Sequence, residues 1–334
     1  MKSSDALVRV YRGNITESIH HVHLAVVNNQ GTLLYQAGDP HFLTFARSTA
    51  KLIQTLPVIE SGAADRFGLE EAEIALCCAS HNGEVEHVST AQHILGKLGF
   101  NHAHLQCGAH EPYHAATAQA MRDRGEAPTT LHNNCSGKHS GMLTLTAHLG
   151  ASPDTYMRIE HPVQQLMLET VCEMSGMSRE QIQLGTDGCG VPVFGMPIKH
   201  LALAFARLGN PAGLSQTRAN ACQRIVAAVR KYPQFLAGSD RFDTQLIEIT
   251  NGRIVGKMGA EGLFALTIPE RELGFVLKIE DGNLRATYPA VVEALKQLDL
   301  LTESEVSALA AFHTPAVYNW QGTQVGYIRP DFQL

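Results

Sequence analysis

Strand-like runs lie near both ends of the chain, and a long helical stretch separates them. Near the N-terminus, residues 21–27 alternate, residues 28–31 (NNQG) have turn chemistry, and residues 32–36 continue as a second strand. Three more short runs, separated by turns, follow in the C-terminal third: residues 252–258, 262–268 and 274–279. Because strands do not alternate with single helices, a doubly wound parallel sheet is disfavoured. This order predicts one antiparallel sheet built from both chain ends.

Between these runs the apolar residues recur at three- and four-residue spacing, which is typical of helices. The expected helices cover residues 48–59, 87–98, 114–124, 138–149, 162–174, 200–208, 216–231 and 289–298. Pro57 is expected to disturb the far end of the first of them. We therefore predict an α+β fold in which an α/β lobe covers about residues 1–60 and 245–334. A mostly helical lobe is expected over about residues 61–244.

The composition narrows the class of protein. With 44% apolar and 17% charged residues, the 334-residue chain is not intrinsically disordered. A net charge of −6 gives no electrostatic reason to bind nucleic acid or an anionic membrane. We see no secretory signal and no apolar run near the roughly 18 residues of a membrane span. Seven cysteines, an odd number, argue against a disulfide framework, so we expect a cytoplasmic protein.

The first candidate for catalysis is Ser48 with Lys51, the chain's only SxxK sequence. At this spacing on a helix, the hydroxyl and the amine lie on one face. A serine becomes a good nucleophile only when a nearby base takes its proton, and a neutral lysine can be that base. One SxxK is also roughly what chance delivers in a chain of this length.

Two further motifs extend this pattern. Residues 80–84 (SHNGE) follow an apolar run, and residues 257–262 (KMGAEG) lie at the end of a predicted strand. Alone, the first is compatible with a polar helix-end loop and the second with a hairpin turn. Together, the order SxxK, SxN, KxG resembles the SxxK, SDN, KTG order of serine β-lactamases and penicillin-binding proteins. Ser80 and Lys257 thereby join the catalytic candidates.

Two cysteines lie in glycine-rich polar segments: Cys135 in residues 133–142 (NNCSGKHSGM) and Cys189 in residues 187–192 (DGCGVP). Thiolates suit Zn²⁺, and a catalytic zinc takes about three protein ligands. The third ligand is Lys138, His139 or Asp187. Chemistry alone favours His139 or Asp187, because a lysine binds metal only as the neutral amine. The alternative is a reactive or structural thiol pair without a metal.

These motifs make the chain resemble the bacterial L-asparaginase II family, the class 3 asparaginases of the Rhizobium etli type. The resemblance rests on RSTAK (47–51), SHNGE, NNCSGKHSGM, DGCG, KMGAEG and IEDG (279–282), in the family's order along most of the chain. It implies a single unit of two lobes, similar in fold to serine β-lactamases and glutaminases. It also implies hydrolysis of L-asparagine to L-aspartate and ammonia, with homodimers usual.

The resemblance also implies roles for particular residues. It pairs Ser48 with Lys51 and Ser80 with Lys257. It gives zinc the ligands Cys135, Lys138 and Cys189, which overrules the chemical preference for His139.

The resulting mechanism has Ser48 attack the side-chain amide, while Lys51, or Lys257 through Ser80, takes the hydroxyl proton. Arg47, always charged and forked, suits the substrate's α-carboxylate.

The remaining candidates would bind substrate. Asp187 either pairs with the α-ammonium group or holds a zinc-bound water, and Asn82 and His139 donate hydrogen bonds. Simpler interpretations are a surface ion pair for Arg47, a helix cap for His139 and a turn for Asp187.

Two other classes of function compete. One is a glutaminase or β-lactam-directed enzyme on the same scaffold, which would not need the two thiolates. The other is a non-catalytic zinc- or amino-acid-binding protein, which would not need both Ser–Lys pairs.

Overall fold

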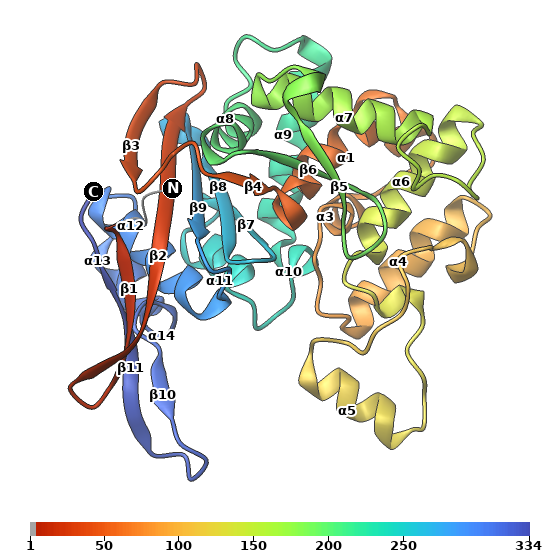
Figure 1. Ribbon diagram of the computed structural model, residues 1–334. Helices are drawn as coiled ribbons and strands as arrows, with labels where there is room; N and C mark the ends of the chain where they lie inside the picture. Colours follow the sequence, from red (N-terminus) through yellow and green to blue (C-terminus); the bar gives the residue numbers. More distant parts are fainter. Residues whose placement is uncertain (1–4) are drawn as a thin grey trace. The chain divides into compact units, whose positions relative to one another are not determined.

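Both ends of the chain contribute strands to one antiparallel sheet, as the sequence predicts (Figure 1). In the computed structural model, which describes residues 5–334, the sheet has the order β10-β11-β1-β2-β9-β8-β7, and β3 pairs with β2. Its strands are β1 (Leu7–Arg12), β2 (Ile15–Asn28), β3 (Leu33–Ala37), β7 (Val255–Gly259), β8 (Leu263–Ile268), β9 (Leu273–Ile279), β10 (Ala316–Tyr318) and β11 (Gln324–Asp331). The predicted N-terminal hairpin is the β2–β3 pair, with Leu24 opposite Ala37. The α+β class is therefore confirmed, although β1, β10 and β11 were not expected from the sequence.

The chain divides into two compact units. Unit 1 comprises the described residues up to Thr49, together with Met196–Asn210 and Gln245–Leu334, and it contains the sheet. Unit 2 comprises Ala50–Gly195 and Pro211–Thr244.

Helices cover both faces of the sheet in unit 1. They are α8 (Ile198–Gly209), α12 (Thr287–Gln297), α13 (Glu303–Ala308) and α14 (Ala310–His313), and α11 (Phe242–Ile249) runs into the unit from unit 2. On β9, a Cβ at Gly274 would overlap the backbone of α8. On β8, Phe264 lies opposite Leu277 of β9 and contacts Tyr288 of α12 edge to face. Because successive strand side chains alternate between faces, Gly274 and Leu277 point to opposite sides. Burial on both faces explains the nearly continuous apolar sequences of β8 and β9.

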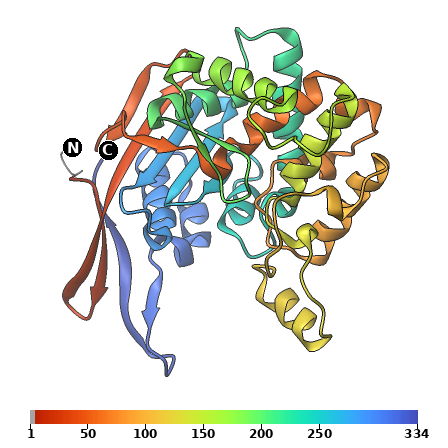
Figure 2. The same ribbon diagram turned by 45° about the vertical axis from the view of Figure 1, so that its right-hand side comes forward.

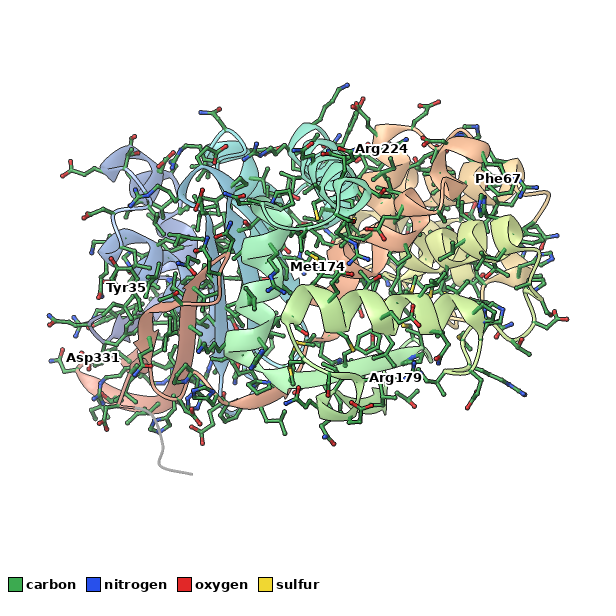
Figure 3. All side chains as sticks on the ribbon, turned by 90° about the horizontal axis from the view of Figure 1, so that it is seen from above. Tyr35, Phe67, Met174, Arg179, Arg224 and Asp331 are labelled. Atoms are coloured by element: carbon green, nitrogen blue, oxygen red, sulfur yellow. The ribbon has the colours of Figure 1, made fainter. Side chains whose placement is uncertain are left out.

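Unit 2 is mostly helical. Its helices are α1 (Lys51–Glu60), α2 (Ala63–Arg66), α3 (Glu71–Cys77), α4 (Val85–Lys97), α5 (Ala115–Asp123), α6 (Ser136–Leu149), α7 (Pro162–Ser175), α9 (Gln216–Lys231) and α10 (Pro233–Leu236). Strand β5 (Gln183–Thr186) pairs with β6 (Pro192–Pro197), which ends at the start of α8. Figure 2 shows these elements from a second direction. Met174 of α7 and Arg224 of α9 are labelled in Figure 3. Met174 is fully buried, whereas the Arg224 guanidinium lies 2.6 Å from the Asp65 carboxylate.

Helix α6 is the innermost helix of unit 2. It contacts α1, α2, α3, α4 and α7, and its residues from Ser136 to Thr146 are all buried. A helix buried on every side has no solvent-facing stripe. Its polar side chains must therefore find partners inside the unit, and the hydroxyls of Ser140, Thr144 and Thr146 each donate to the carbonyl four residues earlier.

Two local expectations need correction near the start of unit 2. Ser48 lies on a 3₁₀ turn, Arg47–Ala50, which follows β4 (Leu43–Phe45), and the α-helix begins only at Lys51. Pro57 lies inside α1, which nevertheless continues to Glu60. Over residues 5–334, no helix is long and apolar enough to cross a membrane.

Candidate active site

A buried lysine connects three of the sequence motifs. Lys51 is the first residue of α1, and its amine is fully buried in unit 2. Its Nζ donates to the Ser80 hydroxyl at 2.8 Å and lies 3.1 Å from the Cys135 sulfur. A third bond, of 2.6 Å, reaches the carbonyl oxygen of Ala79. Lys51 is thus in direct contact with the hydroxyl that the resemblance assigns to Lys257.

The two cysteines singled out in the sequence lie together. Their thiols are within hydrogen-bonding distance of each other, and both residues are buried. The hydrogen bond to Cys189 and then burial raise the pKa of the Cys135 thiol. The same hydrogen bond, helped by the positive charge of Lys138, lowers the pKa of Cys189 despite burial. The opposite directions of the two pKa shifts favour the thiolate form at Cys189 over that at Cys135.

Lys138 and Asp187 complete this cluster. The Lys138 Nζ lies 2.9 Å from the Cys189 sulfur and 3.7 Å from the Asp187 carboxylate. Asp187 is also 3.6 Å from the Cys189 sulfur. Burial lowers the pKa of the Lys138 amine, but the negative charges around it outweigh burial and raise that pKa overall. Without a metal, Lys138 is an ammonium group facing a thiolate. We call Cys135, Lys138, Asp187 and Cys189 the thiol–lysine cluster.

A tight turn carries Cys189 into the cluster. The Asp187 N–H donates to the Val191 carbonyl at 2.8 Å, and the Gly190 N–H donates to the Asp187 carbonyl at 2.9 Å. Gly190 has φ of +88°, a left-handed conformation that favours glycine. A Cβ there would also approach the Met157 side chain to 3.3 Å. The DGCG sequence therefore gives the β5–β6 connection the turn that points Cys189 inward.

His139 is buried beside the cluster with one nitrogen unsatisfied. Its Nδ1 is 2.6 Å from the Tyr156 hydroxyl, and its Nε2 has no hydrogen-bond partner. Burial, together with the charge of Lys138, lowers the pKa of His139 to about 3, so the imidazole is neutral. The Tyr156 hydroxyl also accepts from the Gln106 N–H at 3.0 Å. In the tautomer in which this hydroxyl donates its own proton, Nδ1 of His139 is the acceptor. The remaining hydrogen then lies on Nε2, a buried donor suited to a ligand.

Asn82 is buried, and both ends of its side-chain amide are engaged. Its Nδ2 donates to the Asp240 carboxylate at 2.5 Å, and its Oδ1 accepts from the Arg241 guanidinium at 3.0 Å. Asp240, Arg241 and Tyr156 were all missed by the sequence reasoning. Asp240 and Arg241 follow a glycine and a serine in what looks like an ordinary turn, and no motif surrounds Tyr156.

Three candidate residues belong to unit 1. Ser48 is partly exposed, and Lys257 lies fully buried on β7, with its Nζ donating to the Met258 carbonyl at 2.8 Å. Arg47 lies 3.8 Å from the Glu261 carboxylate. Arg47 and Glu261 have φ of +45° and +64°, conformations that non-glycine residues rarely adopt. Such outliers concentrate at functional sites. Arg47 directly precedes Ser48, the candidate nucleophile, and Glu261 lies within the KMGAEG motif.

The thiol–lysine cluster offers sulfur and nitrogen donors, which are ligand types that zinc takes in proteins. The Lys138 amine lies 2.9 Å from the Cys189 sulfur, and Cys135 forms a hydrogen bond with Cys189, all three residues being buried. Within residues 5–334, no three His, Cys, Asp or Glu side chains form a group that could hold a metal. A three-ligand site here therefore requires the lysine nitrogen, in its neutral form.

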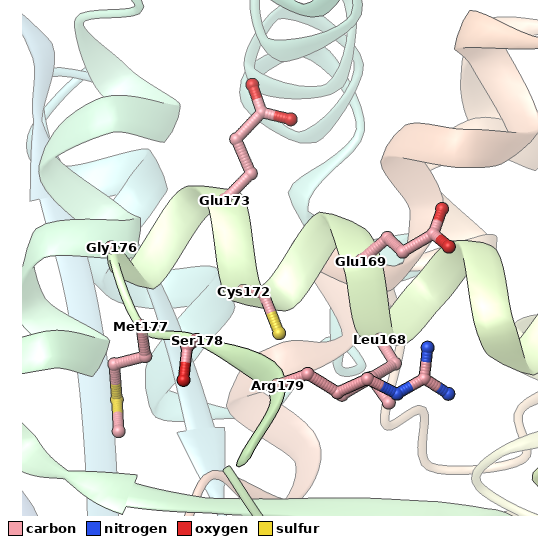
Figure 4. A pocket seen from close by; sticks show the side chains of 8 residues that line it. All are labelled: Leu168, Glu169, Cys172, Glu173, Gly176, Met177, Ser178 and Arg179. Carbon is pink, nitrogen blue, oxygen red and sulfur yellow. The ribbon is translucent and has the colours of Figure 1, made fainter. Parts of the chain in front are cut away.

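Two cavities in unit 2 differ in their relation to this cluster. One, of about 440 Å³, is lined by residues around the C-terminal end of α7, including Cys172 and Arg179, and contains no residue of the motifs (Figure 4). The other, of about 390 Å³, is lined by Met157, Arg158, Thr186 and Gly190 among others. It borders the turn that carries Asp187 and Cys189.

Comparison with known proteins gives one family. The model of the L-asparaginase II family matches residues 8–330. No curated protein matches the sequence.

Several solved structures are similar to the chain. A β-lactamase from Mycobacterium bovis is 18% identical, with a TM-score of 0.41, over 87% of this chain and 95% of that one. A class C β-lactamase from Rhodobacter sphaeroides is 14% identical, with a TM-score of 0.40, over 82% and 94%.

Proposed function

The chain belongs to the L-asparaginase II family, a family of amidohydrolases, and we propose that it hydrolyses L-asparagine to L-aspartate and ammonia. The observation that carries the proposal is the position of Lys51. It brings the RSTAK, SHNGE and NNCSGKHSGM motifs of the family together around one buried amine. A fully buried lysine beside a serine hydroxyl is an arrangement suited to proton transfer.

In the proposed reaction, the Ser48 oxygen attacks the carbon of the substrate's side-chain amide. A bond forms between this oxygen and the carbon, and the hydroxyl proton passes to Lys51, or to Lys257 through Ser80. The carbon–nitrogen bond then breaks, and the leaving nitrogen takes the proton and departs as ammonia. Water next attacks the acyl-enzyme ester, which releases aspartate and restores the serine. The 2.8 Å contact between Lys51 and Ser80 supports Ser80 as a member of the proton relay.

Four residues are proposed to bind substrate. Arg47 pairs with the α-carboxylate, and His139 donates from Nε2 to the substrate or to the tetrahedral intermediate. Asn82 gives one N–H of its side-chain amide to Asp240 and is proposed to donate the other to the substrate. Asp187 acts within the thiol–lysine cluster, either on the substrate's ammonium group or, if zinc is bound there, by holding a water that the zinc would carry.

We further propose that Cys135, Lys138 and Cys189 hold a zinc ion. When bound there, zinc would supply a Lewis acid beside the substrate. Binding requires Cys135 and Lys138 to lose the protons that their raised pKa values retain, so zinc affinity should fall as the pH is lowered.

Replacing Cys189 by alanine should remove bound zinc. Loss of one of three protein ligands should weaken binding by more than about 10²-fold, since changes outside the ligand shell already cost 10- to 100-fold. The measurement is zinc per chain by atomic emission after gel filtration. Cys172→Ala is the matched control, because this half-buried thiol lines the separate cavity on α7. Stoichiometric zinc in Cys189→Ala, or none in the unaltered protein, would refute the ligand assignment.

Ammonia release tests the proposed activity directly. The purified protein should release ammonia from L-asparagine and much less from L-glutamine. One methylene typically gives about 10- to 200-fold discrimination, so the two substrates should be assayed side by side. Release mainly from L-glutamine would make the chain a glutaminase. No release from either by folded, zinc-loaded protein would leave a different amide substrate or a binding role.

The quaternary structure and cellular location are also proposals. We propose a homodimer in the cytoplasm, as the family resemblance and the cysteine usage suggest. A molar mass of about 73 kDa by light scattering would support the dimer, since one chain has a mass of 36.3 kDa.

A further inference from the structure

A short loop of unit 2, residues 236–241, is fastened to the SHNGE motif at several points. The Ser80 N–H donates to the Leu236 carbonyl at 2.9 Å, and the Ser239 N–H donates to the Glu84 carboxylate at 2.9 Å. Gly238 has φ of +137°, and a Cβ there would overlap the Asn82 amide and approach Glu84 to 2.8 Å. Only glycine allows this close approach. The loop is therefore held in a fixed position next to Ser80.

The same loop fixes the orientation of the Asn82 amide. The nitrogen end faces the Asp240 carboxylate, and the oxygen end faces the Arg241 guanidinium. The reverse orientation would set oxygen against carboxylate and N–H against guanidinium. Asn82 is 2% exposed, whereas Asp240 is exposed. The exposed carboxylate of Asp240 is thus hydrogen-bonded to the buried amide of Asn82, which lies two residues along the chain from Ser80.

We propose that Asp240 binds the α-ammonium group of the amino-acid substrate, with Asn82 and Arg241 as its positioning residues. This inference rests on the proposed function, because it concerns the substrate of the same site. The other candidate carboxylate, Asp187, already faces the Lys138 amine at 3.7 Å inside a buried cluster. A second ammonium group there would compete with Lys138, whereas at Asp240 it would meet an exposed carboxylate that, among residues 5–334, accepts only from Asn82.

The assignment defines the substrate class. The chain should take β-amides of α-amino acids that carry a free, protonated amine. It should discriminate against succinamate, in which hydrogen replaces that amine, and against N-acylated asparagine. Without the ammonium group, the Asp240 carboxylate keeps only solvent and, from the described part of the chain, the Asn82 N–H as partners, so the lost ion pair should appear in kcat/KM.

The test compares L-asparagine with succinamate in four proteins: the unaltered chain, Asp240→Asn, Asp187→Asn and Asp123→Asn. We expect Asp240→Asn to lower kcat/KM for L-asparagine on the order of 10- to 100-fold and to change that for succinamate less than about twofold. Asp123→Asn, which removes an exposed carboxylate from α5, should leave both values unchanged. Equal losses on both substrates in Asp240→Asn would mean that Asp240 only supports the loop. Loss of discrimination in Asp187→Asn alone would move the ammonium site to Asp187.

A binding experiment separates this inference from the proposed activity. Calorimetry with L-aspartate and with succinate compares ligands that differ only in the amine and needs no turnover. The unaltered chain should bind L-aspartate more tightly, and Asp240→Asn should abolish the difference. If the chain releases no ammonia but shows this pattern, the proposed function fails while the ammonium site stands. No preference for L-aspartate in the unaltered chain would overturn the assignment.

Discussion

Replacing Ser48 by alanine should reduce ammonia release from L-asparagine on the order of 10⁴-fold or more. Alanine removes the only atom that can form the acyl bond, and no alternative group at this position can replace it. Ser48 is partly exposed on the turn before α1, whereas the neighbouring Thr49 is fully buried and donates to the Ala46 carbonyl at 2.6 Å. The accessible hydroxyl of this pair is therefore the one assigned to attack. Steady-state kinetics with excess L-asparagine measures the loss.

Two controls make this result specific. Ser89→Ala removes a hydroxyl from α4 that only donates to the Glu86 carbonyl, so its activity should equal that of the unaltered protein. Zinc content and the urea denaturation midpoint of Ser48→Ala should also be unchanged. Substantial residual turnover in a correctly folded Ser48→Ala protein would exclude Ser48 as the nucleophile, and Ser80→Ala would then be the next variant to assay.

The regular part of the fold could be read from the sequence because its signals are local. Strands β8 and β9 are short apolar runs between turns, and α9 follows its predicted bounds, 216–231, to the residue. Strand β1 was missed because it buries only Val8 and Val10 and is otherwise polar or half exposed. Its place in the sheet depends on β2 and β11, which lie on either side of it.

The contacts within the candidate site, like the place of β1 in the sheet, depend on residues far apart in the sequence. Local motifs identified Lys51, Ser80 and Cys135, but which lysine contacts Ser80 depends on how α1 packs within unit 2. Lys51 and Ser80 are 29 residues apart, so no spacing rule predicts their 2.8 Å contact. Asp240 lies 158 residues from Asn82. Such partners carry no sequence signal of their own, because an aspartate in a turn is ordinary chemistry for a turn.

Gly137 shows how a motif residue can be interpreted wrongly and still matter. From the sequence, Gly137 is expected in a glycine-rich polar segment, directly before a helix that begins at residue 138. In the structure Gly137 is helical, within α6, and a Cβ there would overlap the Leu76 carbonyl oxygen and approach its Cγ to 2.7 Å. Gly141, one turn later, faces Cys77 at a similarly close 3.0 Å. These glycines let α6 and α3 approach closely, which fixes the helix that carries Cys135 at its start and Lys138 in its first turn.

Gly137→Ala should therefore lower the free energy of unfolding by about 3 kcal/mol or more, at the upper end of the effects of overpacking a core, because the clash is with backbone rather than with a flexible side chain. Urea denaturation followed by circular dichroism measures the change. Gly96→Ala on α4 is the matched control: it is also a helical glycine, it is exposed, and nothing lies within 4 Å of its added Cβ. That control should be neutral or more stable by up to about 1 kcal/mol, since alanine is the better helix former.

Any Gly137→Ala protein that still folds must shift α6 away from α3, so it should also bind zinc more weakly, whereas Gly96→Ala should not. Equal stability and zinc binding in the two variants would show that the close α3–α6 approach is not needed to build the thiol–lysine cluster.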